Sequence, residues 1–210
     1  MKKIVYSLLL SSALFATNYE DGMKAFQAKN YDTAMKFFSI AGDKDKDVRS
    51  IRNLGIMYAS GIGVEKDPEK AVALLKKASN GGDSYAGFSL GNMYAQGDGV
   101  KKDFKEAAIW FEKSANAGNS QAAYNLAYLY TYGDGVKKDS KKAFELYEQA
   151  AVAGSIDAQI NLAFIYISAQ GVEKDMKKAA FWAKKALDTG DERVKKVWEE
   201  FELEKYLEKK

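Results

Sequence analysis

The chain repeats itself every 36 residues, and this spacing restricts its fold more than any other feature of the sequence. Six kinds of residue recur at this step in four successive copies. They are Leu54, Leu90, Leu126 and Leu162; Tyr58, Tyr94, Tyr130 and Tyr166; Gly63, Gly99, Gly135 and Gly171; Val64, Val100, Val136 and Val172; Asp67, Asp103, Asp139 and Asp175; and Gly82, Gly118, Gly154 and Gly190. Such a period implies that each copy is one supersecondary unit and that neighbouring units stack to bury a shared core.

Two helices are predicted within each copy. In residues 120–155, apolar side chains between residues 121 and 132 recur at helical spacing, and a second periodic run covers residues 142–152. We call the first run helix A and the second helix B. One column of large residues on helix B is expected in the core: Leu74, Trp110, Leu146 and Trp182.

The boundaries of helix B are marked by turn and capping residues. Residues 133–139 contain two glycines, which adopt positive φ without steric cost, and end on Asp139. An aspartate at this place is expected to cap the first free N–H groups of helix B. The equivalent Asp67 is followed by Pro68, a favourable first helical residue. Gly154 then marks the end of helix B.

These columns resemble the Sel1-like repeat, a relative of the tetratricopeptide repeat. The resemblance is carried by Leu90-Gly91-Asn92-Met93-Tyr94-Ala95-Gln96-Gly97-Asp98-Gly99-Val100 with Asp103, and by counterparts 36 residues away. It covers four repeats, at residues 48–83, 84–119, 120–155 and 156–191. The resemblance implies an all-α fold, an α-α solenoid wound as a right-handed superhelix. The last copy has Ala169 in place of the first loop glycine, so we expect that loop to turn less tightly.

The segments on either side of the repeats are expected to cap the stack. Residues 17–47 contain two helical runs with a short connection, which favours a tetratricopeptide-like hairpin. Residues 192–210 place Val194, Val197 and Trp198 among charges, which predicts an amphipathic capping helix. Terminal repeats of a solenoid need a polar outer face of this kind.

The N-terminus has the three regions of a secretory signal peptide. Lys2 and Lys3 precede an apolar run over residues 4–14, which is too short to span a bilayer. We expect cleavage after Ala16, so residues 1–16 form the signal peptide and the mature protein is periplasmic or secreted. We expect no transmembrane segment after cleavage.

Composition excludes several classes of function. Among 210 residues there is neither Cys nor His, so disulfides, zinc sites, thiolate nucleophiles and imidazole catalysis are excluded. The formal net charge is +3 and basic residues form no long block, which argues against a nucleic-acid partner. We expect no catalytic residue, metal or cofactor.

Candidate binding residues lie on helix A, opposite Leu126 and Tyr130, which we expect to be buried. The family resemblance implies that helix A lines the concave face of the solenoid. Positions at i, i+4, i+7 and i+11 form one stripe along each helix A. We call the following residues the helix-A stripe: Arg49, Asn53, Ile56, Tyr85, Ser89, Asn92, Gln96, Gln121, Asn125, Tyr128, Tyr132, Asp157, Asn161 and Phe164.

One column of this stripe has two interpretations. Asn53, Ser89, Asn125 and Asn161 could hold the backbone of an extended peptide, because the amide offers two donors and an acceptor. They could equally tie helix A to a neighbouring loop or helix end. The aromatic residues of the stripe would supply the anchors, since they offer large contact area at low entropy cost.

The sequence therefore predicts a non-catalytic interaction module of the cell envelope. The partner is expected to be a protein, a peptide or a cell-wall-associated ligand, and the protein itself a monomer. A structural spacer that assembles through its end caps is an alternative. Another is β-lactamase or penicillin-binding activity, which is assigned to some members of the Helicobacter cysteine-rich protein family that the chain partly resembles. We disfavour it, because the cysteines are missing and Ser140 is followed by Lys141-Lys142-Ala143 instead of completing an S-x-x-K motif.

Overall fold

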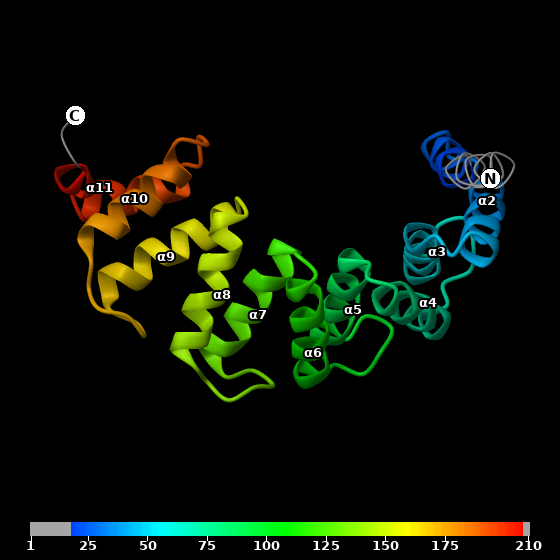
Figure 1. Cartoon of the computed structure of the whole chain (residues 1–210), viewed down its shortest axis with the longest axis horizontal. Helices are drawn as coiled ribbons and strands as arrows, with labels where there is room; N and C mark the ends of the chain where they lie inside the picture. Colours follow the sequence, from blue (N-terminus) through cyan, green and yellow to red (C-terminus); the bar gives the residue numbers. More distant parts are fainter. Residues whose placement is uncertain (1–17, 208–210) are drawn as a thin grey trace, which may run out of the picture. The chain divides into compact units, whose positions relative to one another are not determined.

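The computed structural model of the chain describes residues 18–207, and every regular element in this range is a helix (Figure 1). The architecture is the α-α solenoid implied by the repeats. The predicted signal peptide, residues 1–16, lies outside the described residues. In the part of the chain that the structure describes, no helix combines the length and the apolar character needed to cross a bilayer.

The chain divides into two compact units, Met1–Lys102 and Asp103–Lys210. In the first unit, residues 18–27 are helical and are followed by α2 (Tyr31–Lys44), α3 (Val48–Ser60), α4 (Pro68–Asn80) and α5 (Ser84–Gln96). From α2 onward, each helix packs against the next one along the chain. This is the sequential helix pairing expected of stacked repeats.

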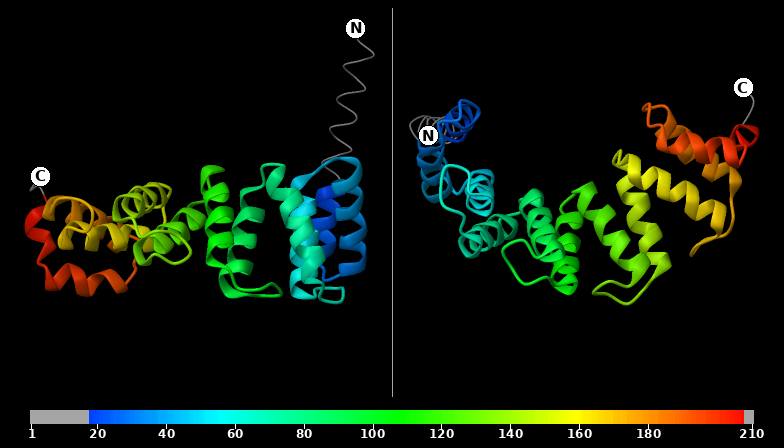
Figure 2. Two further views of the ribbon diagram at one scale, coloured as in Figure 1. Left: turned by 90° about the horizontal axis from the view of Figure 1, so that it is seen from below. Right: turned by 180° about the vertical axis from the view of Figure 1, so that it is seen from behind.

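The second unit continues the same pattern. It contains α6 (Phe104–Asn116), α7 (Ser120–Tyr132), α8 (Ser140–Val152), α9 (Ile156–Ser168), α10 (Met176–Leu187), α11 (Arg193–Glu200) and the 3₁₀ helix η1 (Leu203–Tyr206). Each of α6 to α10 packs against its successor, and η1 also lies on α10. Within each unit, both views of Figure 2 show consecutive helices side by side.

The predicted N-caps of helix B are confirmed. Asp139 accepts the backbone N–H of Lys142 at 2.9 Å, and Asp67 accepts that of Lys70 at 2.9 Å, with Pro68 as the first residue of α4. Helix A has side-chain caps as well, which the sequence analysis did not identify: Asp47, Asp83, Asn119 and Ser155. Each cap satisfies backbone N–H groups that would otherwise lack a partner at a helix start.

The second loop glycine packs on the preceding repeat. Gly135 has φ +69°, and a Cβ atom added there would lie 2.3 Å from the backbone carbonyl carbon of Phe104 at the start of α6. Gly171 approaches the first residue of α8, Ser140, in the same way at 2.9 Å. These glycines therefore serve contacts between repeats in addition to the turn itself.

The core is formed by leucines of helix A and by a column of helix B one residue beyond the predicted one. Leu90, Leu126 and Leu162 are fully or almost fully buried. The prediction for helix B was correct only for Trp182, because Leu74, Trp110 and Leu146 are half-buried. The buried column is Leu75, Phe111, Tyr147 and Ala183. Tyr130 is likewise half-buried and not in the core, with the ammonium group of Lys142 4.6 Å from its ring centre.

The loop after α9 turns as tightly as its counterparts, so the expectation of a looser turn was wrong. Ala169 adopts φ 56° and donates its N–H to the carbonyl of Ile165. Gly133 does the same at φ 82°, with the carbonyl of Leu129 as acceptor. An alanine has thus been placed in the left-handed region that favours glycine.

The C-terminal helix is shorter than the predicted span of residues 192–210. The helix α11 ends at Glu200, after which Glu202 takes a left-handed conformation with φ 47° and η1 begins. Val194, Val197 and Leu203 are buried. The segment therefore covers apolar surface at the end of the second unit with two short helices.

Candidate binding surface

Four aromatic side chains of the helix-A stripe face solvent. The exposed fractions are 60% for Tyr85, 46% for Tyr128, 62% for Tyr132 and 42% for Phe164. On the same helices the leucine column is buried. The helical spacing thus places the aromatic residues of the stripe on the side away from the core, Tyr85 in the first unit and the other three in the second.

In the first unit, two stripe residues of α3 already contact the helix over residues 18–27. The guanidinium carbon of Arg49 lies 4.0 Å from the ring centre of Tyr19, and its Nη2 bonds to Asp47 at 2.6 Å. The Asn53 amide nitrogen lies 3.3 Å from the sulfur of Met23. These contacts favour the interpretation in which the polar column ties helix A to a neighbouring element.

A buried ion pair links α3 to the start of α5. Nη1 of Arg52 lies 2.9 Å from Oδ2 of Asp83, whose side chain is only 4% exposed. The other carboxylate oxygen of Asp83 accepts the N–H of Ala86 at 2.8 Å and caps α5. The guanidinium carbon of Arg52 also lies 5.6 Å from the ring centre of Tyr85. The exposed ring of Tyr85 is therefore paired with a cation of its own chain.

The other stripe residues of the first unit add polar groups. Ser89 donates its hydroxyl to the carbonyl of Tyr85, one turn earlier in α5, at 2.9 Å. Asn92 is half-buried on the same helix, and Gln96 is exposed at its last residue. Ile56 on α3 is half-buried.

In the second unit the stripe borders a cavity of about 180 Å³. We call it the aromatic cup. Its lining comes from α7, α8 and α9 and from the residue that follows the α9 turn: Tyr124, Tyr128, Thr131, Tyr132, Tyr147, Asn161, Phe164, Ile165 and Gln170. Four stripe residues, namely Tyr128, Tyr132, Asn161 and Phe164, are thereby brought together. Gln121 and Asn125 of α7 do not line the cup.

The cup is held in shape by contacts among its own side chains. The rings of Tyr128 and Tyr132 lie 4.5 Å apart between centres, and those of Tyr124 and Tyr147 lie 5.6 Å apart edge to face. Asn161 forms a side-chain hydrogen bond with Tyr124, which joins α9 to α7. Aromatic pairs in these geometries are favourable beyond their buried area.

Two phenols of the cup are hard to ionise. Burial raises the pKa of Tyr147 to about 12, despite a hydrogen bond with Thr131 that acts in the opposite direction. Burial also raises the pKa of Tyr124, and the negative charge of Asp157 adds to the rise. The phenols therefore remain neutral at physiological pH and act as hydrogen-bonding and stacking groups.

The remaining stripe residue of α9, Asp157, pairs with the C-terminal segment. Its carboxylate lies 2.6 Å from Nη1 of Arg193, whose Nη2 also bonds to Asp191 at 2.6 Å. Arg193 lies 36 residues after Asp157, so α11 begins in the register of a further helix A. The stripe residue at the start of α9 is therefore engaged in an ion pair.

Sequence reasoning missed five residues of the cup: Tyr124, Thr131, Tyr147, Ile165 and Gln170. Tyr124 stands where an earlier repeat has Arg52, so a comparison of the repeats could have identified it. Tyr147 belongs to the buried column of helix B and comes from a different helix. Spacing on a single helix cannot identify a neighbour of that kind.

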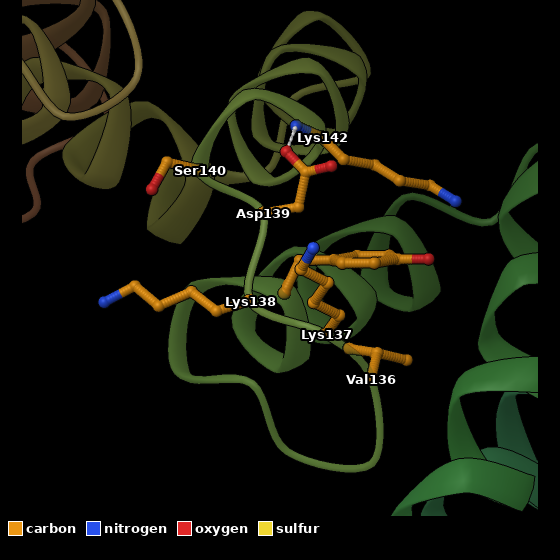
Figure 3. Close-up of a pocket in the computed structure, with 7 residues that line it drawn as sticks. Val136, Lys137, Lys138, Asp139, Ser140 and Lys142 are labelled. Carbon is orange, nitrogen blue, oxygen red and sulfur yellow. Dashed lines mark hydrogen bonds between the residues drawn. The ribbon is translucent and has the colours of Figure 1, made fainter.

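A second and larger cavity, about 690 Å³, lies at the loop between α7 and α8 (Figure 3). It is lined by Tyr130, Val136, Lys137, Lys138, Asp139, Ser140 and Lys142. Asp139 is engaged as the cap of α8, and Lys142 bonds to Glu112 at 3.1 Å. No group of three or more acidic residues suited to a metal ion is found within residues 18–207. Two charged residues of this cavity are therefore already engaged in contacts within the chain.

Comparison with known proteins gives a family match over most of the chain. The family model described as "Sel1 repeat" matches residues 14–46, 48–83, 84–119, 120–155 and 156–191. The last four matches have the same bounds as the four copies defined by the 36-residue spacing. The first covers the N-terminal hairpin, which the family model thus counts as a further Sel1 repeat. No curated protein matches the chain.

Solved structures with the same fold include bacterial Sel1 repeat proteins. A Sel1 repeat protein from Oxalobacter formigenes is 31% identical with a TM-score of 0.78, over 84% of this chain and 72% of that one. The protein c5321, a protective antigen of uropathogenic Escherichia coli strains, is 26% identical with a TM-score of 0.79, over 88% of this chain and 40% of that one. The Helicobacter pylori cysteine rich protein B is 26% identical with a TM-score of 0.47, over 67% of this chain and 93% of that one.

Proposed function

The chain belongs to the Sel1 repeat family, and from this premise we propose that it is a non-catalytic interaction module of the cell envelope that binds its partner through the helix-A stripe. Sel1 repeat proteins are generally modules for protein–protein interaction. We assign the binding surface to helix A because four aromatic side chains are exposed there: Tyr85, Tyr128, Tyr132 and Phe164. Aromatic residues are enriched among the residues that dominate binding energy at protein interfaces.

The aromatic cup favours the second unit as the main binding site for the partner. It combines exposed rings with the amides of Asn161 and Gln170 in a concave site. Sites of this composition bind a side chain through apolar area and orient it through a few polar groups. In the first unit, Arg49 and Asn53 contact the helix over residues 18–27.

The proposed location rests on the N-terminal sequence. Residues 1–16 have the charged and apolar regions of a signal peptide, with Ala16 before the expected cleavage site. N-terminal sequencing of the protein from the envelope fraction should begin at Thr17. A protein that retains Met1 and stays with the cytoplasmic fraction would contradict this location.

The proposed lack of catalysis also has a direct test. The chain contains no His or Cys and no S-x-x-K motif, so a hydrolase would have to rest on Ser–Lys or carboxylate pairs outside that motif. Purified mature protein is expected to leave a chromogenic cephalosporin unchanged. Turnover that disappears on mutation of one serine would contradict the proposal.

The binding surface is tested by capture of a partner from an envelope extract. The variant Tyr85→Ala/Tyr128→Ala/Phe164→Ala should lose capture while its helical circular dichroism stays that of the natural protein. The matched control is Ile109→Ala/Val152→Ala/Phe181→Ala, which truncates three exposed apolar side chains of helix B. Capture that survives in the first variant would place the site elsewhere.

A further inference from the structure

The aromatic cup differs from other rings of the chain in how its rings are covered. Arg49 covers the ring of Tyr19, Arg52 lies near that of Tyr85, and Lys185 lies 5.3 Å from the ring centre of Phe181. Within residues 18–207, no cation of the chain lies over Tyr128, Tyr132 or Phe164. The chain thus pairs many of its rings with cations but leaves the exposed rings of Tyr128, Tyr132 and Phe164 without one.

The lining of the cup and the ends of its helices favour a positive charge. No charged side chain lines it. Thr131 and Tyr132 belong to the last turn of α7, while Ile165 and Gln170 lie at the end of α9. The C-terminus of a helix carries a partial negative charge that stabilises cations, and neither helix has a basic residue in its last turn. The faces of the aromatic rings add further negative potential.

The size of the cup restricts the occupant to a single side chain. Its volume of about 180 Å³ is below the range of roughly 300–1,000 Å³ that is usual for small-molecule sites. A guanidinium group is planar, so it can stack on a ring face, and its N–H groups can donate in its own plane. The lining offers the amide oxygens of Asn161 and Gln170 as acceptors, together with the hydroxyl oxygens of Thr131 and the tyrosines.

We propose that the aromatic cup binds the arginine side chain of an extended peptide segment of the partner. This inference rests on the proposed function, because it specifies the chemistry that the helix-A stripe recognises in the second unit. The arginine stacks between the rings of Tyr128 and Phe164 and is held by the negative ends of α7 and α9. This contact between two molecules has the same chemistry as the contact between Arg49 and Tyr19 within the chain.

The test compares two peptides that differ only at the head group of one side chain. The peptide acetyl-Gly-Gly-Arg-Gly-Gly-amide and its citrulline analogue are titrated into the isotope-labelled full chain, and binding is followed by amide chemical shifts. The arginine peptide is expected to bind at least about tenfold more tightly, since citrulline keeps the length and planarity of the side chain but loses the positive charge and replaces one nitrogen donor group with a carbonyl acceptor. Shift changes should be concentrated at the ends of α7 and α9. Equal affinity of the two peptides, or no binding of either, would overturn the proposal.

A pair of variants assigns the binding to the cup. Tyr128→Leu/Phe164→Leu keeps apolar bulk but removes the rings, and it should reduce arginine-peptide affinity about tenfold or more. Tyr128 is 46% and Phe164 42% exposed, and both stay apolar, so the fold is expected to persist, and circular dichroism checks this. Phe181→Leu is the control, because Phe181 is an exposed ring of α10 outside the stripe. Equal loss in both variants would overturn the assignment to the cup.

Failure of this inference is distinguishable from failure of the proposed function. If the stripe variant loses partner capture but arginine and citrulline peptides bind alike, the interaction surface stands and the arginine specificity falls. If the arginine peptide binds at the cup but partner capture is unaffected by the stripe variant, the cup chemistry stands and the proposed function falls.

Discussion

At the scale of single residues, the position after each helix A reveals where the chain carries backbone strain. Gly61, Gly97, Gly133 and Ala169 all adopt left-handed conformations there, but only Ala169 has a Cβ atom. For residues other than glycine this conformation costs roughly 1–2 kcal/mol. The last repeat therefore keeps the turn of its counterparts at a cost in stability.

Replacing Ala169 by glycine should raise the free energy of unfolding by about 1 kcal/mol, because the strain of the left-handed alanine is removed. Guanidinium unfolding followed by circular dichroism measures the change. The control is Ala153→Gly, at a helix end where φ is −76° and alanine is unstrained. The explanation fails if both substitutions lower stability to the same extent.

A second residue-scale prediction concerns Tyr147, whose pKa burial raises to about 12. The unfolded phenol ionises near pH 10, so the unfolded chain loses its proton first. The stability due to the neutral buried phenol is therefore fully present below pH 10 and is lost as pH rises towards 12. The loss amounts to about 2–3 kcal/mol.

The variant Tyr147→Phe should lack this contribution to alkaline destabilisation, since it has no proton to lose. Unfolding free energies of both proteins at pH 9 and pH 11.5 give the comparison, and the lysine titration common to both cancels in the difference. Parallel pH curves for the two proteins would contradict the role assigned to burial of this phenol.

At the scale of helices and loops, consecutive repeats of the second unit meet through a glycine. A Cβ atom at Gly135 would lie within 2.3–2.6 Å of backbone atoms of Phe104 and Lys105 at the start of α6. At Gly133, two residues earlier, the nearest atom would be 3.4 Å away. Both glycines have positive φ, so they differ mainly in the room around them.

Gly135→Ala should therefore lower the free energy of unfolding by about 2–4 kcal/mol, because overlap with backbone adds to the conformational strain. Gly133→Ala is the matched control and should cost about 1 kcal/mol. Thermal and denaturant unfolding of the two variants measure the difference. Equal costs would mean that the loop moves away from α6 without penalty.

At the scale of the whole molecule, a stack of repeats is stabilised by contacts between neighbours. Leu126→Ala removes a side chain that is 1% exposed in α7 and should cost about 2–5 kcal/mol. Because the packing partners of α7 are α6 and α8, hydrogen-exchange protection should fall mainly in the second unit. Protection of α2 and α3 should change little.

The reciprocal variant tests the same principle in the first unit. Leu90 on α5 is fully buried, and Leu90→Ala should reduce protection of α4 and α5 more than that of α9 and α10. A uniform loss of protection along the chain in both variants would indicate a single cooperative structure. The nearest-neighbour account of the stack would then be wrong.

Much of this fold could be predicted from the sequence because it depends on local chemistry. The 36-residue period located the repeats, Asp139 and Asp67 identified the start of helix B, and helical spacing placed Tyr128 on the solvent side. Each of these inferences involves residues within a few turns of one another. Backbone geometry alone then relates sequence distance to position in space.

The cup and the contacts between repeats were decided by the tertiary structure. Tyr147 reaches the cup from α8, Gln170 reaches it from beyond the turn of α9, and Gly135 meets the start of α6. Their proximity depends on how closely neighbouring helices pack, which follows from the volumes of side chains such as Phe111 and Leu162 in the core. The sequence alone determined the repeating helix pairs and the side of each helix that faces solvent. Packing between helices decided which of those side chains share a cavity, because distances across helices are set by core volume and not by spacing along the chain.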